Sequence, residues 1–288
     1  MAKQTTTGKQ LVPISGDEPS KVDKRVMVLE DSLTNVPELW LSVFVFGPEA
    51  GPSFNKMFAR AKCFKAATPD DADLVVFTGS GHDINPKLYG QKPHKSTLIN
   101  DEIDKSNLTL YAFCVKRGIP MFGVCGGAQI LAVANGAGLF QDVDKHGGAH
   151  TFWDEKEKMF IQRCSSVHHQ MVMDHADMEV LATARVSKER WRNGIECDVG
   201  SHADIEAFWF RKTACLGVQG HPEYTGFSDY TRWCLKALDK YYNENPDLCY
   251  RGNDDGAHKL RIKEALLQQR QNLSSTEPTI IVENIVKE

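Results

Sequence analysis

The stretch from Gly123 to Gln129 constrains the fold of this chain more than any other. Its sequence, Gly-Val-Cys-Gly-Gly-Ala-Gln, places Cys125 among glycines where an apolar run ends and a helical spacing begins. The run 119–124 predicts a short buried strand, and residues 128–134 predict a helix. A strand-to-helix corner of this kind holds a nucleophile in a strained backbone conformation, and small neighbours let the turn close.

The helix that we expect after Cys125 would activate its thiol. Unpaired amides and the helix dipole at the N-terminus favour a thiolate. The backbone amide of Gly126 would be placed to hold a developing oxyanion. Taken alone, Cys125 is equally compatible with a buried cysteine that packs as a small hydrophobic side chain.

A second apolar run, 216–218, leads through Gln-Gly to His221-Pro222-Glu223. Pro222 excludes a helix and favours an extended neighbour. Residues two apart in an extended segment point to the same side, so Glu223 can reach the ring of His221. The pattern predicts Cys125 as nucleophile, His221 as acid and base, and Glu223 as the carboxylate that orients the ring. A surface turn is the alternative interpretation of His-Pro-Glu alone.

A third apolar run, 73–78, ends in Gly79-Ser80-Gly81. Glycines at the end of a strand indicate close approach of the backbone to a ligand. The carboxyl ends of parallel strands share one crevice where ligands bind. We therefore expect an α/β fold with an open, mostly parallel sheet and helices on both faces. The loop 79–81 would give a second oxyanion donor beside Gly126.

These motifs resemble the class I glutamine amidotransferases, which carry Gly-x-Cys-x-Gly-x-Gln, as at 123–129, and a downstream His-Pro-Glu, as at 221–223. Within that superfamily, residues 79–90 and 166–170 look most like the gamma-glutamyl-gamma-aminobutyrate hydrolase branch. The resemblance covers about 25–242. It implies a flavodoxin-like α/β fold with a nucleophile elbow and a Cys-His-Glu triad.

The resemblance also implies a reaction. The cysteine would attack the side-chain amide of glutamine or of a gamma-glutamyl amide, and a glutamyl thioester would release ammonia or an amine before water frees glutamate. The hydrolase branch usually has arginine after the nucleophile, where this chain has Gly126, so the exact substrate stays open. The positions that correspond to the family's substrate-holding residues are Gln129, Ser165, Ser166, Val167 and His168.

Several functions remain compatible with the motifs. A glutaminase could supply ammonia to a separate synthetase, or a free-standing hydrolase could cleave gamma-glutamyl amines. A cysteine-elbow α/β-hydrolase would also satisfy Gly-x-Cys-x-Gly, with Asp198 or Asp204 as its acid ahead of His221. An inactive scaffold that binds through its tail is the non-enzymatic alternative.

Length and composition set the expected organisation. With 288 residues, 41% of them hydrophobic, the chain fits one catalytic domain with extensions. We expect a flexible tail at 1–24, a catalytic domain at 25–245, and a linker, helix and tail at 246–288. A synthetase that receives ammonia would then be another polypeptide. The strand-prone segment 279–286 could be an edge strand, a disordered end or a docking strand for a partner.

Charge and residue usage exclude other classes. The net charge of −4 without a basic cluster argues against direct nucleic-acid binding, and no apolar stretch approaches a membrane span. We expect a soluble cytoplasmic protein. The eight cysteines form no Cys-x-x-Cys pair, and two glycines between His146 and His150 disfavour helical metal-ligand geometry, so neither a disulfide framework nor a metal or other cofactor is expected.

The remaining elements follow from local periodicity. Strands are expected at 25–30, 39–46, 178–183 and 205–210, helices at 53–62, 101–116, 228–242 and 258–272, and loops with irregular strands at 136–158.

Overall fold

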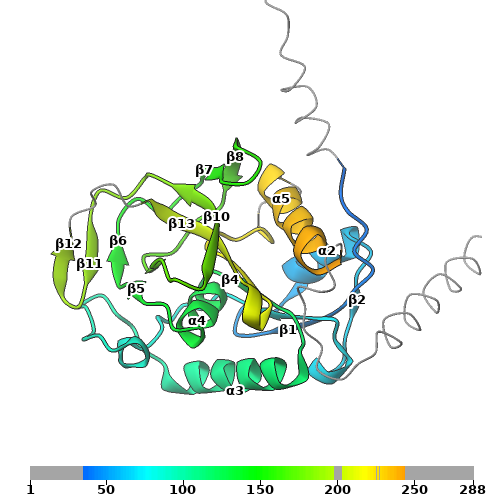
Figure 1. Ribbon diagram of the computed structural model, residues 1–288, viewed down its shortest axis with the longest axis horizontal. Helices are drawn as coiled ribbons and strands as arrows, with labels where there is room; N and C mark the ends of the chain where they lie inside the picture. Colours follow the sequence, from blue (N-terminus) through cyan, green and yellow to red (C-terminus); the bar gives the residue numbers. More distant parts are fainter. Residues whose placement is uncertain (1–34, 198–202, 225, 227, 244–288) are drawn as a thin grey trace, which may run out of the picture. The chain divides into compact units, whose positions relative to one another are not determined.

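A nine-stranded sheet lies at the centre of the fold that begins at Val36 (Figure 1). The structure, a computed structural model, describes residues 35–197, 203–224, 226 and 228–243. The strands of this sheet are β1 (Ser42–Phe46), β2 (Phe64–Lys65), β3 (Leu74–Phe77), β4 (Met121–Val124), β7 (His150–Asp154), β8 (Met159–Cys164), β10 (Met178–Ala184), β13 (Asp204–Phe210) and β14 (Cys215–Val218).

The strand order is β2-β1-β3-β4-β14-β13-β10-β7-β8. Neighbours from β2 to β14 pair in parallel, and those from β14 to β8 pair in antiparallel fashion. In the parallel part, Phe122 lies opposite both Val76 and Leu216. The three strands that precede the glycine motifs are therefore adjacent and in register, which confirms the predicted α/β sheet and brings their carboxyl ends to one edge.

In the part of the chain that the structure describes, four α-helices accompany the sheet: α2 (Pro52–Arg60), α3 (Asp101–Arg117), α4 (Gly126–Ala134) and α5 (Asp229–Leu238). Asn100 begins α3 by accepting hydrogen bonds from the amides of Glu102 and Ile103, and left-handed Gly118 ends it. Ser228 caps α5 through the amide of Thr231. The helices expected at 53–62, 101–116 and 228–242 are thus present with small shifts of their ends.

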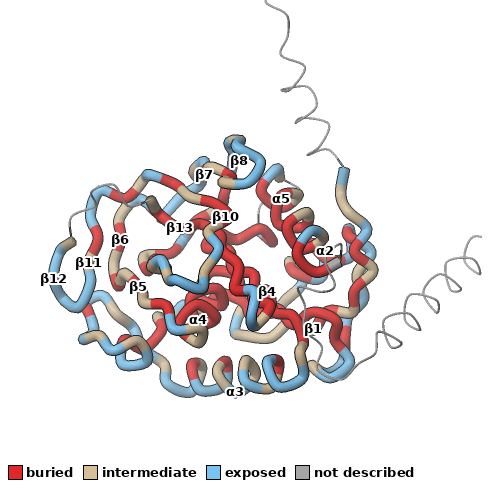
Figure 2. Tube along the Cα trace, in the orientation of Figure 1, coloured by how far each residue is buried: buried red, intermediate tan, exposed pale blue. Residues whose placement is uncertain are grey.

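The helices cover both faces of the sheet. Val75 of β3 and Met121 of β4 share a buried apolar cluster with Ile130 and Leu131 of α4. The residues that alternate with them along each strand point to the opposite face of the sheet. Figure 1 shows α2 and α5 across the sheet from α3 and α4. Figure 2 shows that β4 and α4 are buried along their length, as a central strand and the helix that follows it should be.

Smaller strands complete the fold, and two of them, β5 and β6, lie where irregular strands were expected, at 136–158. A three-stranded sheet joins β6 (Asp142–Val143), β11 (Arg190–Arg192) and β12 (Ile195–Cys197), and a two-stranded sheet joins β5 (Leu139–Phe140) and β9 (Met171–Val172). Short helical turns are η1 (Pro69–Asp71), η2 (Pro86–Tyr89), η3 (Arg211–Thr213) and the π-helical η4 (Asp239–Asn243).

Several expectations fall on residues that the structure does not describe. The strand at 25–30, the helix at 258–272, the segment 279–286 and both predicted domain boundaries lie outside the described residues. Within the described residues, no helix is both long and apolar enough to span a membrane, and the seven cysteines are free thiols.

Replacing Gly127 with alanine should destabilise the protein by about 1–3 kcal/mol or more. A Cβ atom at Gly127 would overlap the backbone carbonyl of Phe77, which cannot rotate aside. Gly81→Ala is the matched control, because a Cβ atom there meets nothing within 4 Å. Urea unfolding of the two variants measures the difference, and equal stabilities would contradict this packing of α4.

Candidate active site

Cys125 occupies a strained turn between β4 and α4. Its φ of 52° and ψ of −114° put a non-glycine residue in a region that L side chains rarely adopt. Its amide donates to the carbonyl of Val218 at 2.9 Å, and its carbonyl accepts from the amide of Gln129 at 3.0 Å. The backbone on both sides of the thiol is thus fixed to β14 and to the first turn of α4.

Two glycines allow this turn to close. A Cβ atom at Gly123 would lie 2.6 Å from the carbonyl oxygen of Gly127, and one at Gly127 would overlap the carbonyl of Phe77. Only backbone without side chains lets α4 approach β3 and β4 this closely. The glycines on each side of Cys125 therefore set the position of the helix N-terminus next to the thiol.

His221 and Glu223 follow β14 and form a buried pair. Nδ1 of His221 lies 2.8 Å from Oε1 of Glu223, and the side chains are 2% and 0% exposed. Because a carboxylate only accepts, Nδ1 carries the proton in this contact. The extended geometry expected from the intervening proline is wrong, because residues 222–224 form a turn in which the amide of Tyr224 donates to the carbonyl of His221 at 3.4 Å. Glu223 reaches the ring of His221 through this turn.

His221 also interacts with Cys125. Among the described residues, Nε2 is buried without a conventional hydrogen-bond partner. Burial lowers the pKa of His221, but the interactions with the Cys125 thiol and the Glu223 carboxylate outweigh burial and raise that pKa to about 10. Cys125, His221 and Glu223, which the sequence predicts as a triad, therefore lie in one cluster.

The loop 79–81 borders this cluster. A Cβ atom at Gly126 would lie 3.3 Å from the backbone nitrogen of Ser80, and one at Gly79 would lie 2.9 Å from Cε1 of His221. The hydroxyl of Ser80 accepts a hydrogen bond from the amide of His82 at 3.0 Å. The backbone of the loop thus contacts the first residue of α4, as the prediction of two oxyanion donors requires.

Two residues beside His221 were missed by sequence reasoning. The ring of Tyr224 stacks on His221 with centroids 4.7 Å apart and planes 8° apart. Its hydroxyl donates to Oε2 of Glu49 at 3.2 Å, and that oxygen lies 3.9 Å from Nδ1 of His221. Glu49 follows β1, which ends at the same sheet edge as the glycine motifs, so strand-end position was the usable signal for it.

The segment 165–170 contains residues 165–168, which were expected to line the substrate. The amide of His221 donates to the carbonyl of Ser165 at 2.7 Å. Ser166 and His168 are buried, whereas the side chain of Val167 is 62% exposed. Gln129, also expected to contact substrate, is buried and donates from Nε2 to the carbonyl of Gln170 at 3.0 Å. The helix after the thiol is thereby tied to this segment.

His169 connects the same segment to the loop after β3. Its Nε2 lies 2.9 Å from Oδ1 of Asp83, and its Nδ1 lies 2.9 Å from Oδ1 of Asp142. The hydrogen bond with Asp83, together with that to Asp142, raises the pKa of His169 to about 9. The charged ring bridges two carboxylates.

The α/β-hydrolase alternative does not fit the described residues. Its candidate acid Asp204 pairs with Arg190 at 2.7 Å and accepts hydrogen bonds from the amides of Val186 and Ser187. The carboxylate that reaches His221 belongs to Glu223. Asp198, the other candidate acid, lies outside the described residues.

Residues 61–223, more than half of the chain, match the model of the family Peptidase C26. This chain belongs to the Peptidase C26 family.

Three curated relatives are similar to parts of this Peptidase C26 protein, and one of them is named a glutamine amidotransferase-like protein. Protein NtpR of Enterococcus hirae is 29% identical over 184 residues, which cover 56% of this chain and 71% of NtpR. The glutamine amidotransferase-like YvdE homolog of Lactococcus lactis subsp. cremoris is 33% identical over 122 residues, 35% of this chain and 64% of that protein. A carbamoyl phosphate synthase small chain of Buchnera aphidicola is 30% identical over 114 residues, 38% of this chain and 26% of that one.

In this Peptidase C26 protein, Glu223→Gln should lower the pKa of His221. The carboxylate stabilises the imidazolium, so a neutral amide favours the uncharged ring and the pKa falls from about 10 toward the ordinary value. NMR titration of the His221 ring measures the shift. Glu179→Gln, which removes a half-exposed carboxylate on β10, is the control that leaves the titration unchanged. A ring that titrates alike in Glu223→Gln and in the parent would contradict the assigned pair.

Proposed function

We propose that this chain is a glutaminase-type cysteine hydrolase that cleaves the side-chain amide of glutamine through a glutamyl thioester. The observation that carries the proposal is the arrangement of Cys125 at a positive-φ turn next to a histidine whose other nitrogen is bonded to Glu223. A nucleophile, a base and a group that orients the base are the parts that acyl transfer requires.

In the first half of the reaction, Nε2 of His221 takes the thiol proton of Cys125, which leaves an imidazolium, and the sulfur attacks the amide carbon of the substrate. The carbonyl oxygen becomes an oxyanion, which the backbone amides of Gly126 and the loop 79–81 would stabilise. The imidazolium of His221 then donates its Nε2 proton to the departing nitrogen. The C–N bond breaks, ammonia leaves, and a thioester joins Cys125 to the glutamyl group.

In the second half, His221 acts as a base. It takes a proton from water, whose oxygen attacks the thioester carbon and forms a second oxyanion in the same place. The C–S bond breaks and glutamate leaves, with the sulfur of Cys125 as the leaving group. Glu223 keeps the ring in the tautomer that both halves use, because its carboxylate holds the proton on Nδ1. Gln129 and the segment 165–168 would hold the glutamate end of the substrate.

The fate of the nitrogen distinguishes two versions of this function. One relative is named the small chain of carbamoyl phosphate synthase, which supports delivery of ammonia to a separate synthetase chain. Glu49 favours the second version, a free-standing hydrolase of gamma-glutamyl amines. Its carboxylate is 29% exposed beside His221 and would attract a leaving group that carries a positive charge.

Covalent labelling tests the nucleophile. A glutamine analogue with a diazo ketone in place of the amide should modify the protein at Cys125, as located by peptide mass spectrometry. Cys125→Ala should lose labelling and glutaminase activity, and Glu223→Gln should lower kcat by about 10⁴-fold while the protein stays folded. Cys197→Ala is the matched control, since Cys197 is partly exposed on β12. Labelling of other cysteines with equal efficiency would refute the assignment.

A comparison of substrates tests the nitrogen acceptor. The lone chain is assayed with glutamine and with the gamma-glutamyl amide of a diamine, and Glu49→Gln is assayed beside it. If Glu49 recognises a cationic leaving group, the variant should raise KM for the diamine amide by about 5–10-fold, equivalent to about 1 kcal/mol, without changing KM for glutamine. Poor turnover of both substrates until a synthetase is added would favour ammonia transfer.

A further inference from the structure

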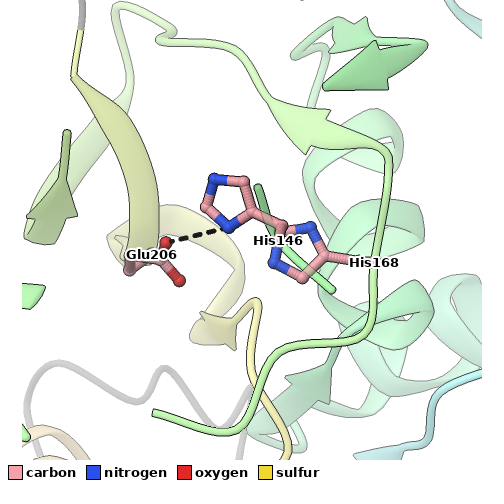
Figure 3. A group of neighbouring side chains, drawn as sticks. All are labelled: His146, His168 and Glu206. Atoms are coloured by element: carbon pink, nitrogen blue, oxygen red, sulfur yellow. Dashed lines mark ion pairs between the residues drawn. The ribbon is translucent and has the colours of Figure 1, made fainter. Parts of the chain in front are cut away.

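A second cluster of buried titratable side chains lies apart from Cys125. It joins His146, from the loop before β7, to His168, from the segment 165–170, and to Glu206, from β13 (Figure 3). The three residues are 1%, 6% and 2% exposed. Buried ionisable groups need partners, so the positions of their protons decide what this cluster can hold.

The hydrogen bonds around His168 fix its tautomer. Nδ1 lies 2.9 Å from the backbone carbonyl oxygen of Gln170. A carbonyl accepts only, so Nδ1 carries the proton and the neutral ring keeps a lone pair on Nε2. Among the described residues, this buried Nε2 has no hydrogen-bond partner.

His146 lies between two carboxylates. Nε2 lies 3.5 Å from Oδ2 of Asp204 and 3.2 Å from the hydroxyl of Ser187, and we place the proton of the neutral ring on Nε2, which has the larger number of partners. Nδ1 then presents a lone pair, and it lies 3.5 Å from Oε1 of Glu206. Within the described part of the chain, Nδ1 of His146 also has no hydrogen-bond partner.

Three potential ligand groups therefore lie close together in the interior. A ring nitrogen of His146, a ring nitrogen of His168 and a carboxylate oxygen of Glu206 lie within 4.8 Å of one another. One added proton on His146 would satisfy the contact with Glu206 but leave Nε2 of His168 unpaired. The Glu206 carboxylate already has a partner in His150, so a water molecule would satisfy the two unpaired ring nitrogens alone, whereas a divalent cation would bind both nitrogens and the carboxylate together.

We propose that His146, His168 and Glu206 bind a zinc ion that holds the segment 165–170 to β13. Two imidazoles and one carboxylate form a known zinc donor set, with bonds of about 2.0–2.2 Å. Two ligand atoms of a tetrahedral ion are then about 3.4 Å apart, close to the 3.5 Å between Nδ1 of His146 and Oε1 of Glu206.

The surroundings match those of protein zinc sites. Zinc-binding histidines usually donate their other N–H to a carboxylate or a backbone carbonyl. His146 has Asp204 in that role, and His168 has the carbonyl of Gln170. The ligating carboxylate is itself hydrogen-bonded, since Nε2 of His150 lies 2.8 Å from Oε1 of Glu206. Outer partners of this kind would orient both rings before the ion arrives.

The ion would act on the candidate active site through the backbone. The amide of Gln219, just after β14, donates to the carbonyl of Glu206 at 2.8 Å, and that of His221 donates to the carbonyl of Ser165. A bond from zinc to His168 would therefore fix the segment expected to bind substrate against the strands that carry the catalytic histidine. The role is structural and requires no step of the proposed reaction.

The sequence predicts no metal site, because only the local spacing of its histidines was considered. His146 and His150 are separated by two glycines, which disfavours a helical pair of ligands. In the structure, His150 contacts Glu206 but is not one of the three proposed ligands. The two ligands beside His146 are His168 and Glu206, which lie farther along the chain. The tertiary fold brings these residues together from three separate parts of the chain.

Metal analysis tests the proposal, with Cys125→Ala as the parent protein so that the reactive thiol cannot hold the ion. Mass spectrometry of the purified protein should find about one zinc per chain. After chelation, zinc titrated against a chromophoric chelator should rebind, and His146→Asn and Glu206→Gln should each lower its affinity by more than 100-fold, beyond the effect typical of outer partners. His169→Asn, next to a ligand but paired with Asp83 and Asp142, should not change it.

A second measurement does not depend on folded variants. Removal of zinc from the parent should speed amide hydrogen exchange in the segment 165–170 relative to α3. A parent that contains no zinc and shows no saturable binding would overturn the proposal and indicate a proton or water in the cluster. Equal affinity in His146→Asn and the parent would place the ion elsewhere and overturn it as well. Because the parent lacks the thiol, either result leaves the proposed glutaminase chemistry untouched.

Discussion

The positive φ of Cys125 is the constraint on which the rest of the site depends. A side chain at φ 52° costs of order 1–3 kcal/mol and persists only where the surroundings determine it completely. Here the surroundings are the hydrogen bond to Val218 on one side and the first turn of α4 on the other. Because the turn is sharp, the thiol stands at the N-terminus of a helix whose glycines contact β3 and the loop after it.

Parallel pairing of the strands brings this strained turn next to the ends of the neighbouring strands. Phe122 is in register with both Val76 and Leu216, so the strands before Gly79, Cys125 and His221 end at nearly the same level. β1 also runs parallel to β3, and its carboxyl end leads to Glu49. Residues that are more than 170 positions apart in the sequence, such as Glu49 and Tyr224, therefore meet at one histidine. The antiparallel half of the sheet contributes to the buried cluster of His146, His168 and Glu206, through β13 and the segments packed beside it.

The difference between the parallel and antiparallel halves of the sheet explains how much of the fold and of the candidate site the sequence could predict. Motifs at the ends of buried strands are local patterns, and they predict the parallel sheet and the clustering of Cys125, His221 and Glu223. The short strands β11 and β12 are only three residues long and have no periodicity to detect. The buried histidine cluster depends on contacts between His146 and Glu206, 60 positions apart, and no local pattern records which carboxylate faces which ring. Such side chains look, in sequence, like ordinary polar residues in loops and strands.

The segment 165–170 lies between the Cys125 site and the buried histidine cluster, and hydrogen bonds hold its backbone in place. The carbonyl of Gln170 accepts from Nδ1 of His168, from Gln129 on α4 and from Gln219 after β14. Three donors on one carbonyl, with Ser165 bonded to His221, leave the backbone of this segment little freedom to follow a ligand. Under the proposed function, a substrate that contacts this segment binds a surface already formed, which favours recognition of one fixed glutamate group over adaptable recognition. Variation among substrates would then have to come from the other side of His221, where Glu49 and Tyr224 are partly exposed and are not held by this carbonyl.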